Sequence, residues 1–276
     1  SCSMDALTYA VATLVLCLFM KVCEMGAEAP ERYFLGLAAL LFVLGTTRLH
    51  MFPLLSLLPG AYYFTRRRRH LVVSFCVVAG VIAWTLAAAI MTTDTRIVQG
   101  ASKGAIALYY VLSPASFLGV LGNTLATADI TNFYYQSFLG NLGWLDTPLH
   151  GARYSILFSL LSLVGLSAIN VAFLRRHWRL SLFLLGNVVL AVLLTFFALL
   201  TTWTPHPATV IEGVQGRYFM LPALVLAFAL GPAGRSSASV GESRIAFSGR
   251  GVAGLLLLGL LALYSLSVTV EALVSR

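Results

Sequence analysis

Charged residues are scarce in this sequence, and their scarcity excludes a soluble protein. Only 10% of the 276 residues are Asp, Glu, Lys or Arg, whereas 59% are hydrophobic. Soluble domains carry about 25% charged residues and could not bury this much apolar side chain. The apolar runs are long and unbroken, whereas a β-barrel would show ~10-residue segments of alternating hydrophobicity. The composition therefore predicts an all-α, polytopic helical membrane protein.

Cysteine is scarce as well, and its spacing indicates neither a disulfide nor a metal site. None of the four cysteines belongs to a C-x-x-C pair, and Cys17 and Cys76 lie within apolar runs. The five histidines are scattered along the chain, so they do not indicate a metal centre either. The sequence also lacks a P-loop and a Rossmann glycine fingerprint, which argues against a nucleotide-driven motor. We therefore predict no metal and no cofactor.

Basic residues outnumber acidic ones, and their positions indicate a membrane topology rather than a nucleic-acid partner. The net charge is +8, and the arginines stand at the ends of apolar runs, as the positive-inside rule describes. The run Arg66–Arg69 should face the cytoplasm, with anionic lipid binding as a secondary possibility. If the later apolar runs cross the membrane in alternating directions, the arginine-rich connections 175–179 and 235–250 lie on the same side. We expect a multi-pass protein in contact with the lipid bilayer and without a nucleic-acid partner.

The apolar runs predict about seven or eight membrane segments in one transmembrane domain, residues 1–276. The runs 33–47 and 51–64 are too short to cross ~30 Å of hydrocarbon alone, so we expect a hairpin of two short helices. Arg48 between them would lie at membrane depth and need a polar partner or a water-filled cavity. The expected segments are residues 5–23, 33–47, 51–64, 71–91, 154–174, 180–202, 218–231 and 252–270.

Residues 93–153 are a long connection that is not hydrophobic enough to cross the membrane again. Ser113 followed by Pro114 is typical of the start of a helix. Asp129 is a candidate cap for a second helix that runs through Tyr134. We therefore expect an external helical loop in this region.

The densest polar cluster beside an apolar run is Glu212–Pro222. Glu212, Gln215, Arg217 and Tyr218 bring an acid, an amide, a guanidinium and a phenol within seven residues, with two glycines between them. An ionisable group at a membrane edge is costly, so the cluster is a candidate functional site on the external face. In the alternative interpretation, Arg217 and Tyr218 only anchor a helix end at the headgroups, and Glu212 pairs with Arg217 structurally.

Two stretches resemble known sequence motifs. Gly213–Phe219, with Pro222 following, resembles the G-V-Q-G-R-Y-F-x-P signature of the domain of unknown function 2142 family of bacterial membrane proteins. Residues 137–149 resemble the external G-W-L-D-x-P segment of that family, and residues 3–7 are similar to its S-x-D-A-L opening. The resemblance covers most of the chain and implies a bacterial inner-membrane protein. Because the chain starts without an initiator methionine, we expect it to be the C-terminal part of a longer protein.

The family in turn resembles GT-C-type glycosyltransferases, which use polyprenyl-phosphate sugars on the external face. The resemblance implies a catalytic carboxylate in a loop that precedes Ser3, so the catalytic residue of this chain is unknown. Arg48 resembles part of a T-K-x segment of those enzymes, with Arg in place of Lys. The implied partners are a polyprenyl-phosphate sugar and a glycan acceptor.

The chemistry of such a transfer assigns candidate substrate-binding roles to several side chains. Arg217, and Arg48 if it reaches the cavity, would bind the phosphate, since a guanidinium can contact it through two hydrogen bonds. Glu212 and Asp146 are external carboxylates, and Trp144 and Tyr218 could stack on a sugar ring. Alternatively, Asp146 makes only an Asx-turn and Trp144 belongs to an interfacial aromatic belt.

Three functional classes remain. The favoured one is a membrane glycosyltransferase in cell-surface polysaccharide assembly. The alternatives are a transporter or flippase of lipid-linked glycan and a non-enzymatic structural subunit of an envelope assembly complex. A transporter would show internal repeats with broken helices in both halves, whereas the sequence indicates one short hairpin.

Overall fold

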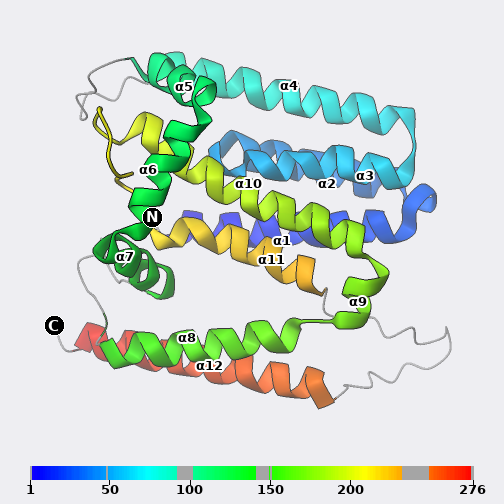
Figure 1. Cartoon of the computed structure of the whole chain (residues 1–276). Helices are drawn as coiled ribbons and strands as arrows, with labels where there is room; N and C mark the ends of the chain where they lie inside the picture. The colour runs from blue at the N-terminus through cyan, green and yellow to red at the C-terminus, as the bar shows by residue number, and fades with distance from the viewer. Residues whose placement is uncertain are drawn as a thin grey trace. The chain divides into compact units, whose positions relative to one another are not determined.

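The computed structural model describes residues 2–47, 49–91, 102–140, 149, 151–231 and 249–274. Every regular element within these residues is a helix, so the predicted all-α class is confirmed (Figure 1). The chain divides into two compact units. The first unit is Ser1–Thr127 with Gly186–Val214, and the second is Ala128–Leu185 with Gln215–Arg276. The prediction of one transmembrane domain stays a prediction.

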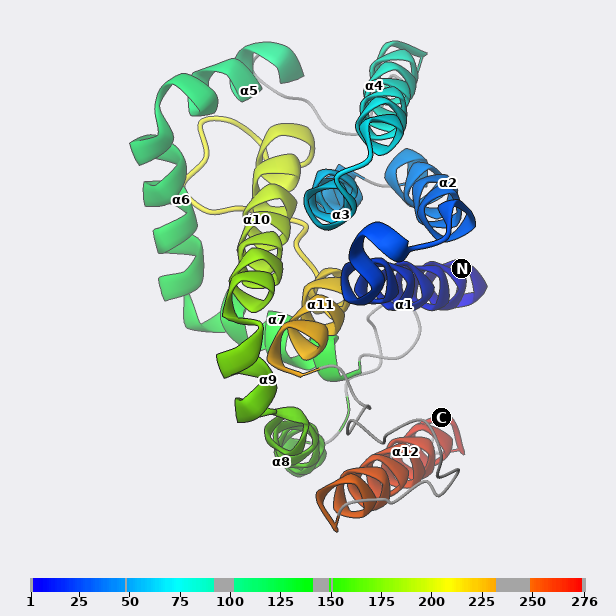
Figure 2. The same cartoon turned by 90° about the vertical axis from the view of Figure 1, so that its right-hand side faces the viewer.

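The first unit is built around four helices that lie side by side (Figure 2). Apolar residues on their facing sides form its core, and Phe19, Phe34 and Leu58 are completely buried. Helix α1 packs against α2 and α3, and α4 packs against α2 and α3. The elements are α1 (Cys2–Met25), η1 (Gly26–Glu28), α2 (Glu31–Thr47), η2 (Leu49–Ser56), α3 (Leu57–Thr65) and α4 (Arg68–Met91).

The predicted hairpin of two short helices is present, with α2 as its first arm. Its second arm begins as the 3₁₀ helix η2 and continues as α3. Pro53 lies inside η2, and an α-helix does not run through it because proline lacks an N–H and its ring clashes with the carbonyl four residues earlier. Helix α3 ends at Thr65, and Arg66 adopts the left-handed conformation with φ 55°.

The arginine run lies at the turn between α3 and α4 and is tied to the connection between α1 and α2. Arg67 donates a 2.7 Å hydrogen bond to the carbonyl of Ala27. Arg69 lies 4.0 Å from the carboxylate of Glu31, a contact that is exposed and therefore contributes little. The two turns consequently form one end of the four-helix group.

Within residues 102–140, the described part of the predicted helical loop before α8, the structure shows three helices. They are α5 (Lys103–Leu112), α6 (Pro114–Ala126) and α7 (Ala128–Leu139). Helix α6 begins at Pro114 as predicted, although the side chain of Ser113 makes no capping hydrogen bond. Asp129 lies in the first turn of α7 rather than at its cap.

Helices α5 and α6 together differ from the sequence expectation. The pair is long and apolar enough to cross a membrane, but the two helices are bent by 100° relative to each other. Such a pair is a broken span or a re-entrant loop. The sequence pattern does not indicate such a pair, because the Ser-Pro break divides the apolar run into two short pieces.

Four helices of the described chain are long and apolar enough to cross a membrane, or five if the bent pair is one span. This number counts full spans only, whereas the seven or eight membrane segments expected include shorter ones. The two arms of the hairpin are shorter than the ~20 residues that a span needs, and Gly216–Leu230 and Leu256–Glu271 are shorter apolar helices. The four ranges are Leu7–Glu28, Arg68–Ala88, Gly151–Ala168 and Trp178–Thr202.

The second unit contains α7 and a long antiparallel pair, α8 (Gly151–Ala168) and α12 (Gly249–Val274) (Figures 1 and 2). Arg153 near the start of α8 forms an ion pair with Glu271 near the end of α12. Its other elements are α9 (Val171–Arg176), η3 (Gly216–Phe219) and α11 (Met220–Leu230). Helix α10 (Trp178–Thr202) contributes its residues from Gly186 onward to the first unit.

Candidate functional site

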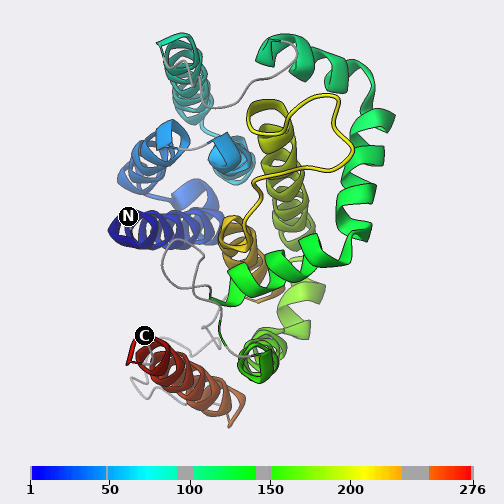
Figure 3. The same ribbon diagram turned by 90° about the vertical axis from the view of Figure 1, so that its left-hand side faces the viewer.

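In the first unit, the extended segment after α10 is held by two buried threonines. The amide of Glu212 donates to Oγ1 of Thr204 at 3.1 Å, and the amide of Ile211 donates to Oγ1 of Thr124 at 2.8 Å. Thr204 and Thr124 are 1% and 0% exposed, so each hydroxyl satisfies a backbone group that water cannot reach. Figure 3 shows the segment running from α10 toward α6, which carries Thr124. The backbone of Glu212 is thereby fixed, while its side chain is exposed.

Gly213 packs against the indole ring of Trp203. Its φ is +76°, a left-handed value that favours glycine. A Cβ at this position would lie 2.3 Å from Cδ1 of Trp203. The first glycine of the cluster therefore allows both a turn and a close approach to the ring.

In the second unit, the other glycine of the cluster locks η3 onto α7. The amide of Gly216 donates a 2.7 Å hydrogen bond to Oγ of Ser137, and that hydroxyl donates to the carbonyl of Phe133 at 2.7 Å. A Cβ on Gly216 would lie 2.1 Å from the carbonyl oxygen of Tyr134 and 2.2 Å from the amide nitrogen of Phe138. Only glycine fits at this contact between two backbones.

Arg217 follows directly on this contact and is half-buried. Its Nε atom is fully buried, and its guanidinium lies 5.8 Å from the ring centroid of Tyr218. The residue stands in the 3₁₀ turn that leads into α11, so it lies at the positive end of that helix dipole. A guanidinium held at a helix N-terminus is suited to binding an anion.

Two further groups line this part of the second unit. Oε1 of Gln215 is buried, and no hydrogen-bond partner for it is found in the described part of the chain. A buried acceptor without a partner costs about 1–3 kcal/mol, which makes it a candidate ligand contact. The rings of Tyr134 and Phe219 meet edge to face at 6.1 Å, and burial raises the pKa of Tyr134 to about 12.

The structure brings together three of the seven predicted site residues. Gln215, Arg217 and Tyr218 stand side by side in the second unit. Glu212 belongs to the first unit, so its pairing with Arg217 stays a prediction. The other three predicted residues, Trp144, Asp146 and Arg48, lie outside the described residues.

The sequence carries no signal for the contribution of α7 or for a pocket in the first unit. Ser137 carries no motif of its own, and its role follows only from its contact with Gly216. The pocket is formed by α5, α6 and the segment after α10, and it includes Tyr110 and His206. No sequence spacing links these two residues, which are 96 positions apart. Within the described ranges, no three His, Cys, Asp or Glu side chains gather where they could hold a metal ion.

Comparison with known proteins places most of the chain in a family. A family model described as "Predicted membrane protein (DUF2142)" matches residues 1–227. This match confirms the resemblance that the 213–222 and 137–149 segments indicated. Searches of curated proteins and of solved structures found no match.

Proposed function

We propose that this chain, which belongs to the family of predicted membrane proteins named above, is a membrane glycosyltransferase of the GT-C-like kind, the kind of enzyme that its sequence motifs resemble. It would transfer sugar from a polyprenyl phosphate during assembly of a cell-surface polysaccharide. The apolar helices imply contact with the lipid bilayer. We further propose that the protein lies in the bacterial inner membrane with its arginine-rich turns in the cytoplasm.

The observation that carries the proposal is the position of Arg217. The leaving group of such a transfer is a phosphate at the membrane surface, and negative charge develops on its oxygen. A guanidinium can bind this group through two hydrogen bonds, and the adjacent N-terminus of α11 adds favourable dipoles. Donors that are already in place stabilise the transition state without reorganisation.

The contact between Gly216 and α7 supplies that rigidity. Since Gly216 is bonded to Ser137 and touches two backbone atoms of α7, the backbone next to Arg217 has little freedom. A binding group must be held within about half an ångström of its working position, and rigid helices achieve this better than loops. This arrangement supports a substrate-binding role for Arg217 over that of a simple membrane anchor.

The remaining candidate residues take substrate-binding roles in this proposal. Gln215 would accept a hydrogen bond through its buried Oε1, and Tyr218 would stack on a sugar. Trp144, Asp146, Glu212 and Arg48 keep the roles expected from the sequence.

The test is lipid-linked sugar transfer by the protein in nanodiscs. We expect Arg217→Ala to abolish transfer, and Arg217→Lys to restore little of it, because an ammonium cannot make the two parallel contacts. Arg153→Ala is the matched control, since that arginine lies in the same unit and pairs with Glu271. If the Arg217→Ala variant keeps full sugar-transfer activity, Arg217 does not belong to the substrate-binding site.

The bend between α5 and α6 favours a transporter as the second candidate function. Discontinuous helices surround the substrate in many transporters. Movement of a fluorescent polyprenyl-phosphate sugar between leaflets, without any transfer, would replace the enzyme proposal by this one. If neither activity is found in the same nanodiscs, a structural role in an envelope complex becomes the leading explanation.

A further inference from the structure

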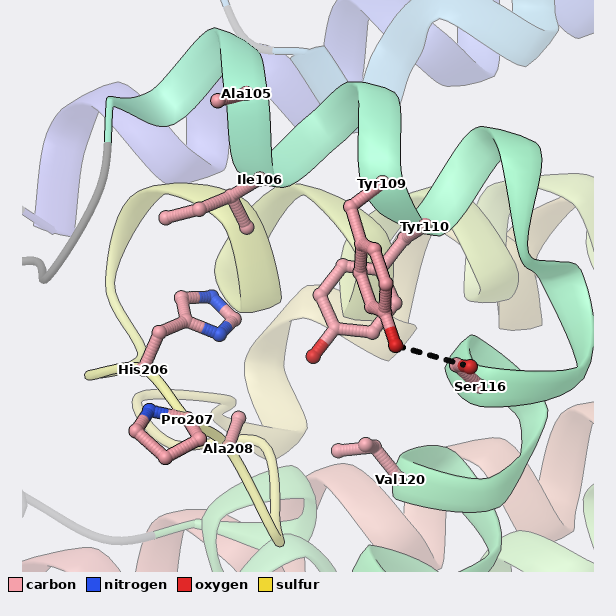
Figure 4. A pocket seen from close by; sticks show the side chains of 9 residues that line it. All are labelled: Ala105, Ile106, Tyr109, Tyr110, Ser116, Val120, His206, Pro207 and Ala208. Atoms are coloured by element: carbon pink, nitrogen blue, oxygen red, sulfur yellow. Dashed lines mark hydrogen bonds between the residues drawn. The ribbon is translucent and has the colours of Figure 1, made fainter.

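A pocket of about 400 Å³ lies in the first unit, in the bend between α5 and α6 (Figure 4). Helix α5 lines it with Ile106, Tyr109 and Tyr110, and α6 lines it with Ser116 and Val120. The spacings i, i+3, i+4 and i, i+4 each mark one face of a helix, so both helices turn one face into the bend. The segment 206–208 closes the remaining side.

The pocket contains hydroxyls and an imidazole that can both donate and accept hydrogen bonds. Tyr109 donates to Oγ of Ser116 at 3.3 Å, which leaves the Ser116 hydroxyl able to donate in turn. Nε2 of His206 lies 3.0 Å from the carbonyl of Leu200 and must donate to it, so Nδ1 is an acceptor in the neutral ring. In Figure 4 the hydroxyl of Tyr110 points into the space that His206 faces from the other side, whereas the hydroxyl of Tyr109 points to Ser116.

Aromatic surface forms a second part of the lining. The ring of Tyr110 is 6% exposed and lies 5.7 Å from the ring of His206. The rings of Tyr109 and Tyr110 meet at an interplanar angle of 74°, so a ligand meets one ring by its face and the other by its edge. Such rigid, amphipathic rings provide large contact areas at little entropic cost.

Among the described residues, none of those that line the pocket is Asp, Glu, Lys or Arg. A phosphate in this pocket would lack a cationic partner, and burying an unpaired charge is costly. The ligand that fits is therefore uncharged, with apolar faces for the rings and several hydroxyls at its edge. The pocket volume lies within the range of ~300–1,000 Å³ found for small-molecule sites.

We propose that this pocket binds a neutral hexose ring. The C–H face of the sugar would lie against a tyrosine ring, and its hydroxyls would pair with Tyr110, Ser116 and His206. The proposal deepens the glycosyltransferase proposal and rests on it. The ring belongs either to the sugar of the lipid-linked donor or to the end of the glycan acceptor.

Binding of methyl hexopyranosides to the full chain in nanodiscs tests the proposal. Saturation-transfer NMR would measure methyl glucoside, galactoside, mannoside and N-acetylglucosaminide. We expect at least one of them to bind, and Tyr109→Ala and Ser116→Ala each to weaken its binding about tenfold, the effect of losing one well-made contact. Tyr63→Ala is the matched control, because Tyr63 is 52% exposed and Tyr109 is 55% exposed.

Competition then distinguishes the two sources of the ring. Displacement of the glycoside by polyprenyl-phosphate hexose, but not by polyprenyl phosphate, supports the donor. Displacement by a neutral oligosaccharide alone supports the acceptor. Absence of glycoside binding, unchanged binding by Tyr109→Ala, or displacement by polyprenyl phosphate itself would each overturn the proposal.

A second readout separates this proposal from the assignment of Arg217. We expect Arg217→Ala to lose sugar transfer and to keep glycoside binding, because that arginine does not line the pocket. If the wild-type protein binds the glycoside but transfers no sugar, the enzymatic function is refuted and the pocket proposal stands.

Discussion

The amide of Gly216 donates a 2.7 Å hydrogen bond to the hydroxyl of Ser137, 79 residues earlier in the chain. This bond joins the start of the α11 region to α7. The hydroxyl is itself bonded to the carbonyl of Phe133, so a chain of two hydrogen bonds connects the candidate site to the helix interior. Arg217 is the next residue along the chain and takes its position from this contact.

Replacing Gly216 by alanine should displace η3 from α7. The added methyl group would overlap the carbonyl of Tyr134 and the backbone of Phe138, and such overpacking costs ~1–3 kcal/mol. We expect a lower melting temperature in nanodiscs and a large loss of sugar transfer. Gly119→Ala is the control, since a Cβ there meets nothing within 4 Å. Equal melting temperatures for the two variants would contradict the tight contact.

Replacing Thr124 by valine should loosen the segment after α10. Valine keeps the shape of threonine but leaves the amide of Ile211 without its 2.8 Å acceptor, at a cost of ~1–3 kcal/mol. We expect faster hydrogen exchange at the Ile211 amide, because local opening governs that rate. Thr131→Val is the control, since its hydroxyl donates to the carbonyl of Ala128 within its own helix. Unchanged protection at Ile211 would show that Thr124 does not hold the segment.

The buried phenol of Tyr134 should make the protein less stable at alkaline pH. Burial raises its pKa to about 12, above the ordinary value of 10.0. Between these values the unfolded chain releases the proton while the folded chain keeps it, so stability is complete below pH ~10 and falls as the pH rises toward 12. Between pH 9 and 11, we expect the melting temperature of Tyr134→Phe to fall less than that of the wild type. Parallel curves for the two proteins would be inconsistent with a buried, protonated phenol.

The predicted topology can be tested with single cysteines in a cysteine-free background. Arg68→Cys should react with a membrane-impermeant maleimide only after the cells are opened, because the arginine run is expected in the cytoplasm. Glu212→Cys should react in intact cells, and its exposed side chain makes it accessible. The opposite labelling pattern would invert the orientation, and reaction of both in intact cells would refute the alternation of the spans.

The sequence predicted the hairpin and the helices around the arginine run more successfully than it predicted the α5–α6 pair. Arg66–Arg69 lies at a helix turn because charged side chains end apolar runs. The sequence did not predict that α5 and α6 are together long enough to cross a membrane. Periodicity indicates two short helices but not the angle of 100° between them. That angle depends on packing, which a local pattern does not contain.

In the candidate site, too, some features can be predicted from the sequence and others appear only in the folded structure. Composition indicates a membrane protein, because no soluble fold can hide so much apolar surface. The long unbroken apolar runs indicate that the class is all-α. The local cluster Gln215–Tyr218 is also visible in the sequence, since its residues are neighbours along the chain. The contacts that hold this cluster and the segment before it cannot be seen in the sequence. Gly216 contacts Ser137 and Ile211 contacts Thr124, and these pairs are 79 and 87 residues apart. The pocket around Tyr110 and His206 likewise exists only after the chain folds, because hydrogen bonding and close packing select such remote pairs in three dimensions.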